Sequence, residues 1–108
     1  MFLLAEAGGE VNPQSGWAPL HYAAFGGHAE AVRFLLGRGA DKDAVAPNGY
    51  TPLMLAVRNG KTEAAKVILY ADPDVNFRAV GGATALRIAR ERDMKDVAEL
   101  LLRSGAVE

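Results

Sequence analysis

The sequence contains no cysteine, which excludes a disulfide framework and thiolate chemistry. It also contains no apolar run near the roughly 20 residues that a membrane-spanning helix needs. Twelve lysines and arginines against 13 aspartates and glutamates give a formal net charge of −1, so nothing draws the chain generally to nucleic acid or an anionic membrane. The apolar residues 1–5 have no basic residue before them and are followed at once by Glu6, so we expect no signal peptide. These absences favour a cytoplasmic protein.

Motifs for catalysis and for cofactor binding are also missing. The phosphate-binding patterns GxxxxGK[ST] and GxGxxG do not occur, and no nucleophile with a base or set of metal ligands stands out. His21 and His28 are isolated from each other, which predicts structural roles and not a zinc site. The acidic pairs in residues 41–43 and 72–74 lack the spaced ligands of a calcium loop, so we expect them to cap loops. The sequence therefore predicts no enzyme, no cofactor and no metal.

What the chain does contain is a complete helical unit at residues 49–76. Thr51-Pro52 offers an N-cap hydroxyl and then a proline suited to the first helical position, which predicts a helix start. Gly60 predicts the end of this helix, because glycine adopts the left-handed backbone that terminates helices. A second helix is expected from Thr62. Its apolar residues recur at helical spacing on one side and are Ala65, Ile68 and Leu69.

This unit recurs along the chain at a constant offset of 33 residues. The offset relates Gly16, Gly49 and Gly82, then Leu20, Leu53 and Leu86, then Ala23, Ala56 and Ala89. A period of this length, with a turn and two helices in each unit, resembles the ankyrin repeat. The segment APLHYAAFGGHAEAVRFLLGRGAD at residues 18–41 is similar to the pattern of that family almost throughout. The resemblance covers residues 13–108 and implies an all-α solenoid of stacked antiparallel helix pairs joined by hairpin-like loops.

The repeats divide one domain, residues 1–108, into four parts. We expect full repeats at 13–45, 46–78 and 79–108, the last of them a C-terminal capping repeat, after a degenerate half repeat at 1–12. Two registers of the half repeat stay open, because either Gly8 matches Gly39 or Glu10 matches Asp43. Its missing first half is compatible with a fragment of a longer array, with engineered termini or with a compact natural cap.

The repeats depart from the family pattern at two helix boundaries. Ala18 stands where Thr51 and Thr84 stand, so the first helix of the first full repeat should start less firmly, by roughly 1 kcal/mol. Asp93 replaces the turn glycine of the earlier repeats, and we expect it in the left-handed conformation, which aspartate tolerates.

Charged side chains are frequent in residues 87–103. They indicate the solvent-exposed outer face of a terminal repeat. A competing hypothesis is a patch for an anionic partner, which the interspersed acids weaken, formed by Arg87, Arg90, Arg92 and Lys95.

Two local features are expected to shape the first and second repeats. The residues Ala46-Pro47-Asn48-Gly49 fit a type I turn, so this loop should project as a short hairpin-like finger. His21 completes part of the Thr-Pro-Leu-His motif of the family. The resemblance implies that its imidazole forms hydrogen bonds that tie turns and neighbouring repeats together.

The resemblance also implies a function, that of a monomeric protein–protein interaction scaffold. Another protein would bind the concave face formed by loop tips and first helices. The positions that match contact sites of the family are Gln14, Ser15, Trp17, Phe25, Pro47, Asn48, Tyr50, Arg58, Asn59, Ala83, Glu91 and Arg92.

Trp17 and Tyr50 occupy one repeat position, and Phe25 and Arg58 occupy another, so we expect them to form a contiguous patch. Aromatic and arginine side chains are the types most enriched in interface hot spots. One alternative is that Trp17 and Tyr50 only pack over the repeat junction. Another is an engineered or structural scaffold without a natural ligand, although the differing helix starts of the three repeats favour a natural ancestry.

Overall fold

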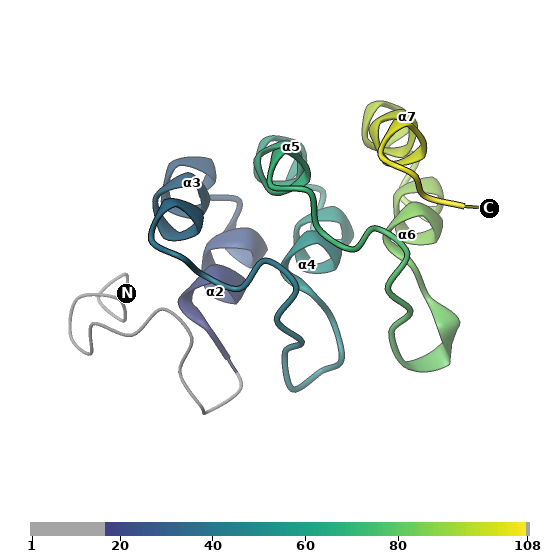
Figure 1. Ribbon diagram of the computed structural model, residues 1–108. Helices are drawn as coiled ribbons and strands as arrows, with labels where there is room; N and C mark the ends of the chain where they lie inside the picture. The colour runs from purple at the N-terminus through teal and green to yellow at the C-terminus, as the bar shows by residue number, and fades with distance from the viewer. Residues whose placement is uncertain (1–16, 108) are drawn as a thin grey trace.

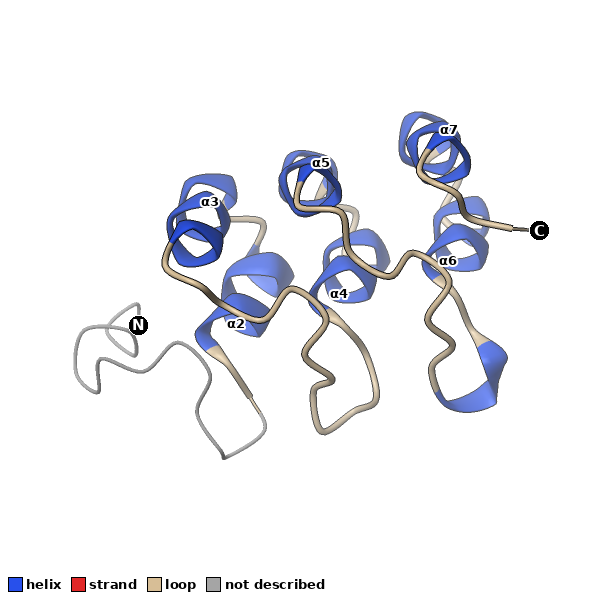
Figure 2. Ribbon diagram, in the orientation of Figure 1, coloured by secondary structure: helices blue, strands red, loops and turns tan. Residues whose placement is uncertain are grey.

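Short helices arranged in pairs make up the chain (Figures 1 and 2). The computed structural model describes residues 17–107. Its helices are α2 (Pro19–Gly26), α3 (Ala29–Gly37), α4 (Pro52–Arg58), α5 (Thr62–Tyr70), α6 (Ala85–Glu91) and α7 (Lys95–Arg103), with a short 3-10 helix η1 (Val80–Gly82). Residues 17–107 contain no strand, which confirms the all-α prediction. None of these helices is long and apolar enough to cross a membrane.

The helices form two layers (Figure 1). The first helices α2, α4 and α6 make one layer, and the second helices α3, α5 and α7 make the other. Each helix packs against its partner in the same pair and against the equivalent helix of the next pair. Because each pair contacts mainly its neighbours, the described residues form a solenoid of three stacked pairs.

The loops that lead into α4 and α6 extend as fingers from the same side of the stack (Figure 2). In the first finger, the N–H of Gly49 donates to the carbonyl oxygen of Ala46 at 2.7 Å, and the N–H of Ala46 donates to Tyr50 at 2.8 Å. The second finger repeats both bonds one offset later, between Gly82, Ala79 and Ala83. The predicted hairpin-like finger is therefore confirmed and occurs twice.

Threonine caps start the first helices of the second and third pairs. The Thr51 hydroxyl accepts the N–H of Met54 at 3.3 Å, and the Thr84 hydroxyl accepts the N–H of Arg87 at 3.2 Å. Ala18 is the N-cap residue of α2 and supplies no side-chain acceptor. The missing side-chain cap at Ala18 is confirmed, while the weaker helix start expected from it stays a prediction.

The turns between the helices of each pair use a left-handed residue. Gly27 and Gly60 have φ of 75° and 71°, and Asp93 has φ of 57° at the same repeat position. This confirms the conformation predicted for Asp93. Asp72 is also left-handed, with φ of 61°, at the position that Gly39 occupies one repeat earlier. The left-handed conformation of Asp72 was not predicted from the sequence.

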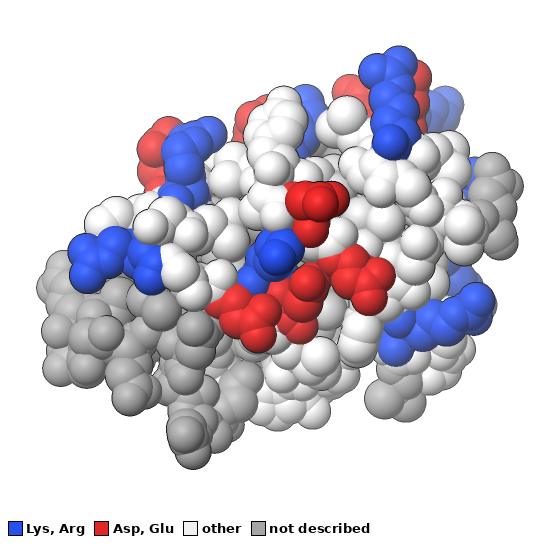
Figure 3. Space-filling model, viewed as in Figure 1, with Lys and Arg blue, Asp and Glu red and all other residues white. Residues whose placement is uncertain are grey.

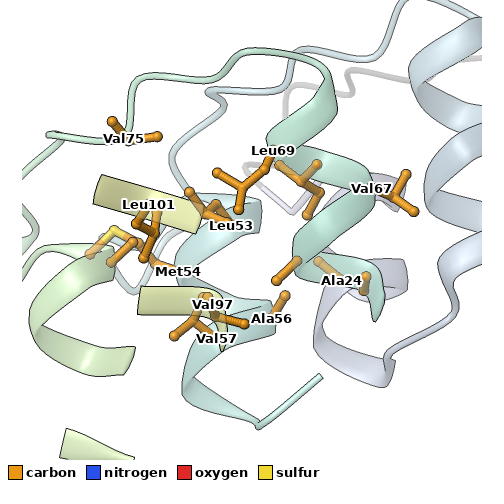
Figure 4. Packing of buried hydrophobic residues seen from close by; sticks show 14 of the residues in the cluster. Ala24, Leu53, Met54, Ala56, Val57, Val67, Leu69, Val75, Val97 and Leu101 are labelled. Atoms are coloured by element: carbon orange, nitrogen blue, oxygen red, sulfur yellow. The ribbon is translucent and has the colours of Figure 1, made fainter. Parts of the chain in front are cut away.

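The core runs continuously through the stack and consists mainly of small and branched apolar residues. The leucines related by the repeat offset, Leu20, Leu53 and Leu86, are at most 3% exposed. Buried alanines such as Ala24 and Ala56 leave room for the helices to approach closely. Figure 4 shows part of this cluster between α4, α5 and their neighbours. Each repeat thus contributes the same positions to a single core.

Side chains in the loops after α3 and α5 tie consecutive repeats together. The Asp43 carboxylate accepts the N–H of Asp74 at 2.8 Å, and one repeat later Asn76 accepts the N–H of Val107 at 2.9 Å. Asp41 accepts the N–H of Asp43 within its own loop. The predicted loop-capping role is confirmed for Asp41 and Asp43, and also for Asp74, which accepts the N–H of Asn76 at 3.0 Å. Figure 3 shows acidic side chains gathered over these loops on the face turned to the viewer.

Candidate interaction surface

The predicted contact positions fall into two groups in each repeat. One group lies on the finger or just before the first helix, and the other lies at the C-terminal end of that helix. Gln14 and Ser15 lie outside the described residues. We describe the remaining positions by the contacts that hold them.

The clearest contact between predicted positions joins Tyr50 to Arg58. The guanidinium carbon of Arg58 lies 5.1 Å from the centroid of the Tyr50 ring. Long side chains on a helix lean towards its N-terminus, so Arg58 at the end of α4 reaches back over the residue that precedes the helix. Tyr50 is half-buried and packs against the core, whereas Arg58 is exposed. The guanidinium therefore lies over an anchored ring, where cation–π attraction favours this arrangement.

Phe25 and Asn59 link the first and second pairs at this surface. Phe25 is 56% exposed at the end of α2. The Asn59 amide donates to the carbonyl oxygen of Phe25 at 3.5 Å. Because Asn59 directly follows Arg58, this bond brings the Arg58–Tyr50 pair and Phe25 to adjoining parts of the surface.

Arg92 occupies the repeat position of Asn59 and lies over the next junction. Its Nη2 atom is 3.7 Å from the point where a Cβ on Gly60 would lie. Asn59 and Arg92 therefore both cross from one repeat to the preceding one.

Trp17 lies in a different environment. It is half-buried, and its ring stands edge-on to His21 at a centroid distance of 5.9 Å and tilted against Tyr22 at 6.0 Å. These aromatic neighbours belong to its own repeat. The structure does not bring Trp17 into ring contact with Tyr50. The local-packing alternative thus fits Trp17 better than it fits Arg58 or Phe25.

The other predicted positions have structural partners of their own. Pro47 and Asn48 are exposed at the finger tip, where the Asn48 side chain accepts the N–H of Tyr50 at 3.2 Å. Ala83 is half-buried against the core. Glu91 pairs with Arg87 at 3.4 Å.

Three exposed aromatic residues were not among the predicted contacts. Tyr70, the last residue of α5, is 82% exposed; the other two are Tyr22 and Phe34. Tyr22 is 52% exposed, although the equivalent Leu55 and Ile88 are buried. Phe34 is 57% exposed, although the equivalent Val67 is buried, and the Arg38 guanidinium lies 5.6 Å from its ring. A comparison of repeat positions would have flagged Tyr22 and Phe34, since an aromatic stands where the later repeats bury an aliphatic side chain.

His21 is the buried titratable group nearest to this surface. Its Nδ1 accepts the N–H of Ala18 at 2.9 Å, and its Nε2 lies 2.8 Å from the carbonyl oxygen of Ala44. Burial lowers the pKa of His21 below its ordinary value, and the Ala44 carbonyl and the Asp41 carboxylate oppose this only in part. The imidazole thus ties the start of α2 to the loop after α3, as predicted for turns, but both contacts lie within repeat 13–45 and do not reach a neighbouring repeat.

No group of three or more histidine, cysteine, aspartate or glutamate side chains within residues 17–107 is placed to hold a metal ion. His28, the other histidine, is exposed at the N-cap of α3.

Comparison with known proteins identifies the repeats. A family model described as ankyrin repeats in three copies matches residues 39–107, and a model of the single ankyrin repeat matches residues 15–46. A search of curated proteins gives no match.

Proposed function

The chain belongs to the ankyrin repeat family, and we propose that it is a protein-interaction module whose partner binds the surface formed by the fingers and the first helices. Ankyrin repeats serve generally as protein–protein interaction modules. The proposal concerns which face of this chain is used and which side chains anchor the partner.

The observation that carries the proposal is the connected set of Phe25, Tyr50, Arg58 and Asn59, which we call the aromatic–arginine patch. Arg58 lies over Tyr50, and Asn59 bonds to the backbone of Phe25. An exposed phenylalanine beside an exposed arginine is the composition of an interface hot spot. Because Arg58 is already held against Tyr50, binding would cost less side-chain entropy than ordering a free arginine.

The finger tips extend this surface beyond the patch. Pro47 and Asn48 are exposed, and the bonds within the finger fix their backbone. Rigid loops beside a hot spot supply shape complementarity without a large ordering cost. We therefore propose that a partner contacts the finger tips at its edge and the aromatic–arginine patch at its centre.

We also propose that residues 79–108 form a capping repeat and that a half repeat at 1–12 precedes the full ones at 13–45 and 46–78. Support for the cap comes from Arg87 and Arg90. These exposed arginines stand at positions where Met54 and Val57 are buried beneath the next pair. Charge at such positions disfavours the stacking of another apolar repeat.

The proposal is tested by affinity capture from a lysate of the source cells with matched variants. The patch variant is Phe25→Ala with Arg58→Ala. The control is Phe34→Ala with Arg38→Ala, which removes the same two residue types from the layer of second helices. The two phenylalanines are matched in exposure, at 56% for Phe25 and 57% for Phe34. Urea melts of both variants confirm that each is folded.

We expect at least one protein to be retained by the wild-type chain and by the control but lost with the patch variant. Its binding is then repeated with the purified partner by titration calorimetry. Equal loss with both variants would place the interface elsewhere. Retention of no protein by any form would favour the alternative of a scaffold without a natural ligand.

A further inference from the structure

A hollow of about 520 Å³ lies beside α6, away from the aromatic–arginine patch. It is bounded by α6, by the finger before it and by the segment after α7. Its described lining includes three arginines, Arg78, Arg87 and Arg90, and a single acid, Glu91. The hollow is of a size that holds one or two side chains of a partner.

The arginines of α6 replace residues that are buried elsewhere in the stack. His21 and Met54 occupy the position of Arg87 and are at most 1% exposed, while Ala24 and Val57 occupy the position of Arg90 and are fully buried. On α2 and α4 this helix face packs against the following pair. On α6 it presents guanidinium groups to the hollow instead.

Glu91, the acid among the described lining residues, offsets the charge of Arg87 only in part. The Nε of Arg87 lies 3.4 Å from Glu91, and both side chains are more than 60% exposed, so the pair is weak. A guanidinium has five N–H donors, and this contact uses one nitrogen of Arg87. Arg78 adds a second exposed guanidinium from the finger.

The hollow also offers an apolar surface. Val107 is 65% exposed at its edge, and Leu86 is buried beneath it. A ligand that fits therefore carries carboxylates together with an apolar group, which is the chemistry of an acidic peptide segment.

We propose that this hollow binds an acidic protein segment, with carboxylates on Arg78 and Arg87 and an apolar side chain on Val107. The planar guanidinium fork matches a carboxylate in two parallel hydrogen bonds. A nucleic acid fits less well. The loop that carries Arg78 also carries Asp72 and Asp74, which repel a long polyanion.

The structure also changes which residues make up the anionic-partner patch expected from the sequence. Lys95 lies with Arg90 in a second hollow of about 300 Å³, where Asp93 and Glu99 balance the charge. Arg92 lies over Gly60 at the repeat junction. Arg78, which the sequence hypothesis left out, takes their place beside Arg87 and Arg90.

The test is fluorescence polarisation at low salt with a labelled peptide that carries glutamates on both sides of one leucine, compared with the same peptide in which glutamine replaces each glutamate. The site variant is Arg78→Gln with Arg87→Gln. The control is Arg33→Gln with Arg103→Gln, which makes the same change in net charge at exposed arginines of the second helices, each paired with a glutamate. Urea melts check that both variants are folded.

We expect the wild-type chain to bind the glutamate peptide and not the glutamine peptide, and the site variant to raise Kd at least about tenfold. The control and the patch variant should stay within about twofold of the wild type. An absence of binding, equal weakening in the control, loss with the patch variant alone, or tighter binding of a single-stranded oligonucleotide of equal charge would each overturn the proposal. The patch variant also separates this site from the aromatic–arginine patch.

Discussion

The Nδ1 of His21 accepts a hydrogen bond from the backbone N–H of Ala18 at 2.9 Å, so the third residue of α2 caps the N-cap residue of its own helix. A backbone N–H can only donate and a carbonyl oxygen can only accept, so the contact with Ala44 requires the neutral Nε2–H tautomer. One imidazole therefore joins the start of α2 to the loop after α3. Protonation of Nδ1 would place two donors face to face.

The stability of the fold should consequently depend on pH through His21. Its pKa is lowered by burial in the folded chain, whereas in the unfolded chain it is about 6.5. Between the folded pKa and about 6.5 the unfolded state binds more protons, so the free energy of unfolding rises with pH in that window. The contribution is complete above about pH 6.5 and is lost as the pH falls towards the folded pKa.

Urea midpoints measured across this window check the prediction. His21→Gln should remove most of the pH slope, while His28→Gln, at the exposed histidine, should leave it intact. His21→Gln is also expected to lower stability at all pH values, so the slope is the quantity compared. A slope that disappears with His28→Gln would contradict the assignment, as would an NMR titration that places the His21 pKa above 6.5.

Ala18→Thr should stabilise the fold by roughly 0.5–2 kcal/mol, because a hydroxyl at this position can accept the N–H of His21 as Thr51 accepts that of Met54. The reverse change, Thr51→Ala, should destabilise by a similar amount. Both are measured as shifts in the urea midpoint. A lower or unchanged midpoint for Ala18→Thr would count against the helix start at this residue, because the imidazole accepts the N–H of Ala18 and not that of His21.

Asp93→Gly should be neutral or mildly stabilising, because glycine reaches φ of 57° without strain. Asp93→Val should be strongly destabilising, since a β-branched residue is a genuine outlier at positive φ. Asp72, at φ of 61°, provides a second site for the same pair of substitutions. If valine matched aspartate in urea melts at either site, the left-handed assignment there would be wrong.

Replacing Tyr50 by alanine should destabilise the fold more than replacing Phe25 by alanine. Phe25→Ala is expected to change the free energy of unfolding by no more than about 0.5 kcal/mol, because the ring is 56% exposed. Tyr50→Ala should cost roughly 1–2 kcal/mol, since the half-buried ring packs against the core. Tyr50→Phe keeps the ring and serves as the control. Equal costs for Phe25→Ala and Tyr50→Ala would contradict the packing described here.

The repeat period made much of the fold predictable. Features that depend on one residue type at one repeat position, such as the Thr51 and Thr84 caps and the left-handed Asp93, followed from aligning the repeats. The left-handed conformation of Asp72 could have been predicted in the same way, because Asp72 aligns with Gly39.

The surface was less predictable, because it depends on where long side chains lie. The stacking of Arg58 on Tyr50 requires the end of α4 to lie close to the base of the finger. The meeting of Arg78 with Arg87 requires the second finger to lie beside α6. Neither of these two side-chain arrangements can be predicted from a local pattern of residue types.

Hydrogen–deuterium exchange of the chain with and without a purified partner tests the central claim most directly. If the partner binds the surface of the fingers and first helices, protection should appear at residues 46–50, at residues 79–83 and at the C-terminal ends of α2 and α4. Protection confined to α3, α5 and α7 would contradict the claim, because those helices form the opposite layer of the stack.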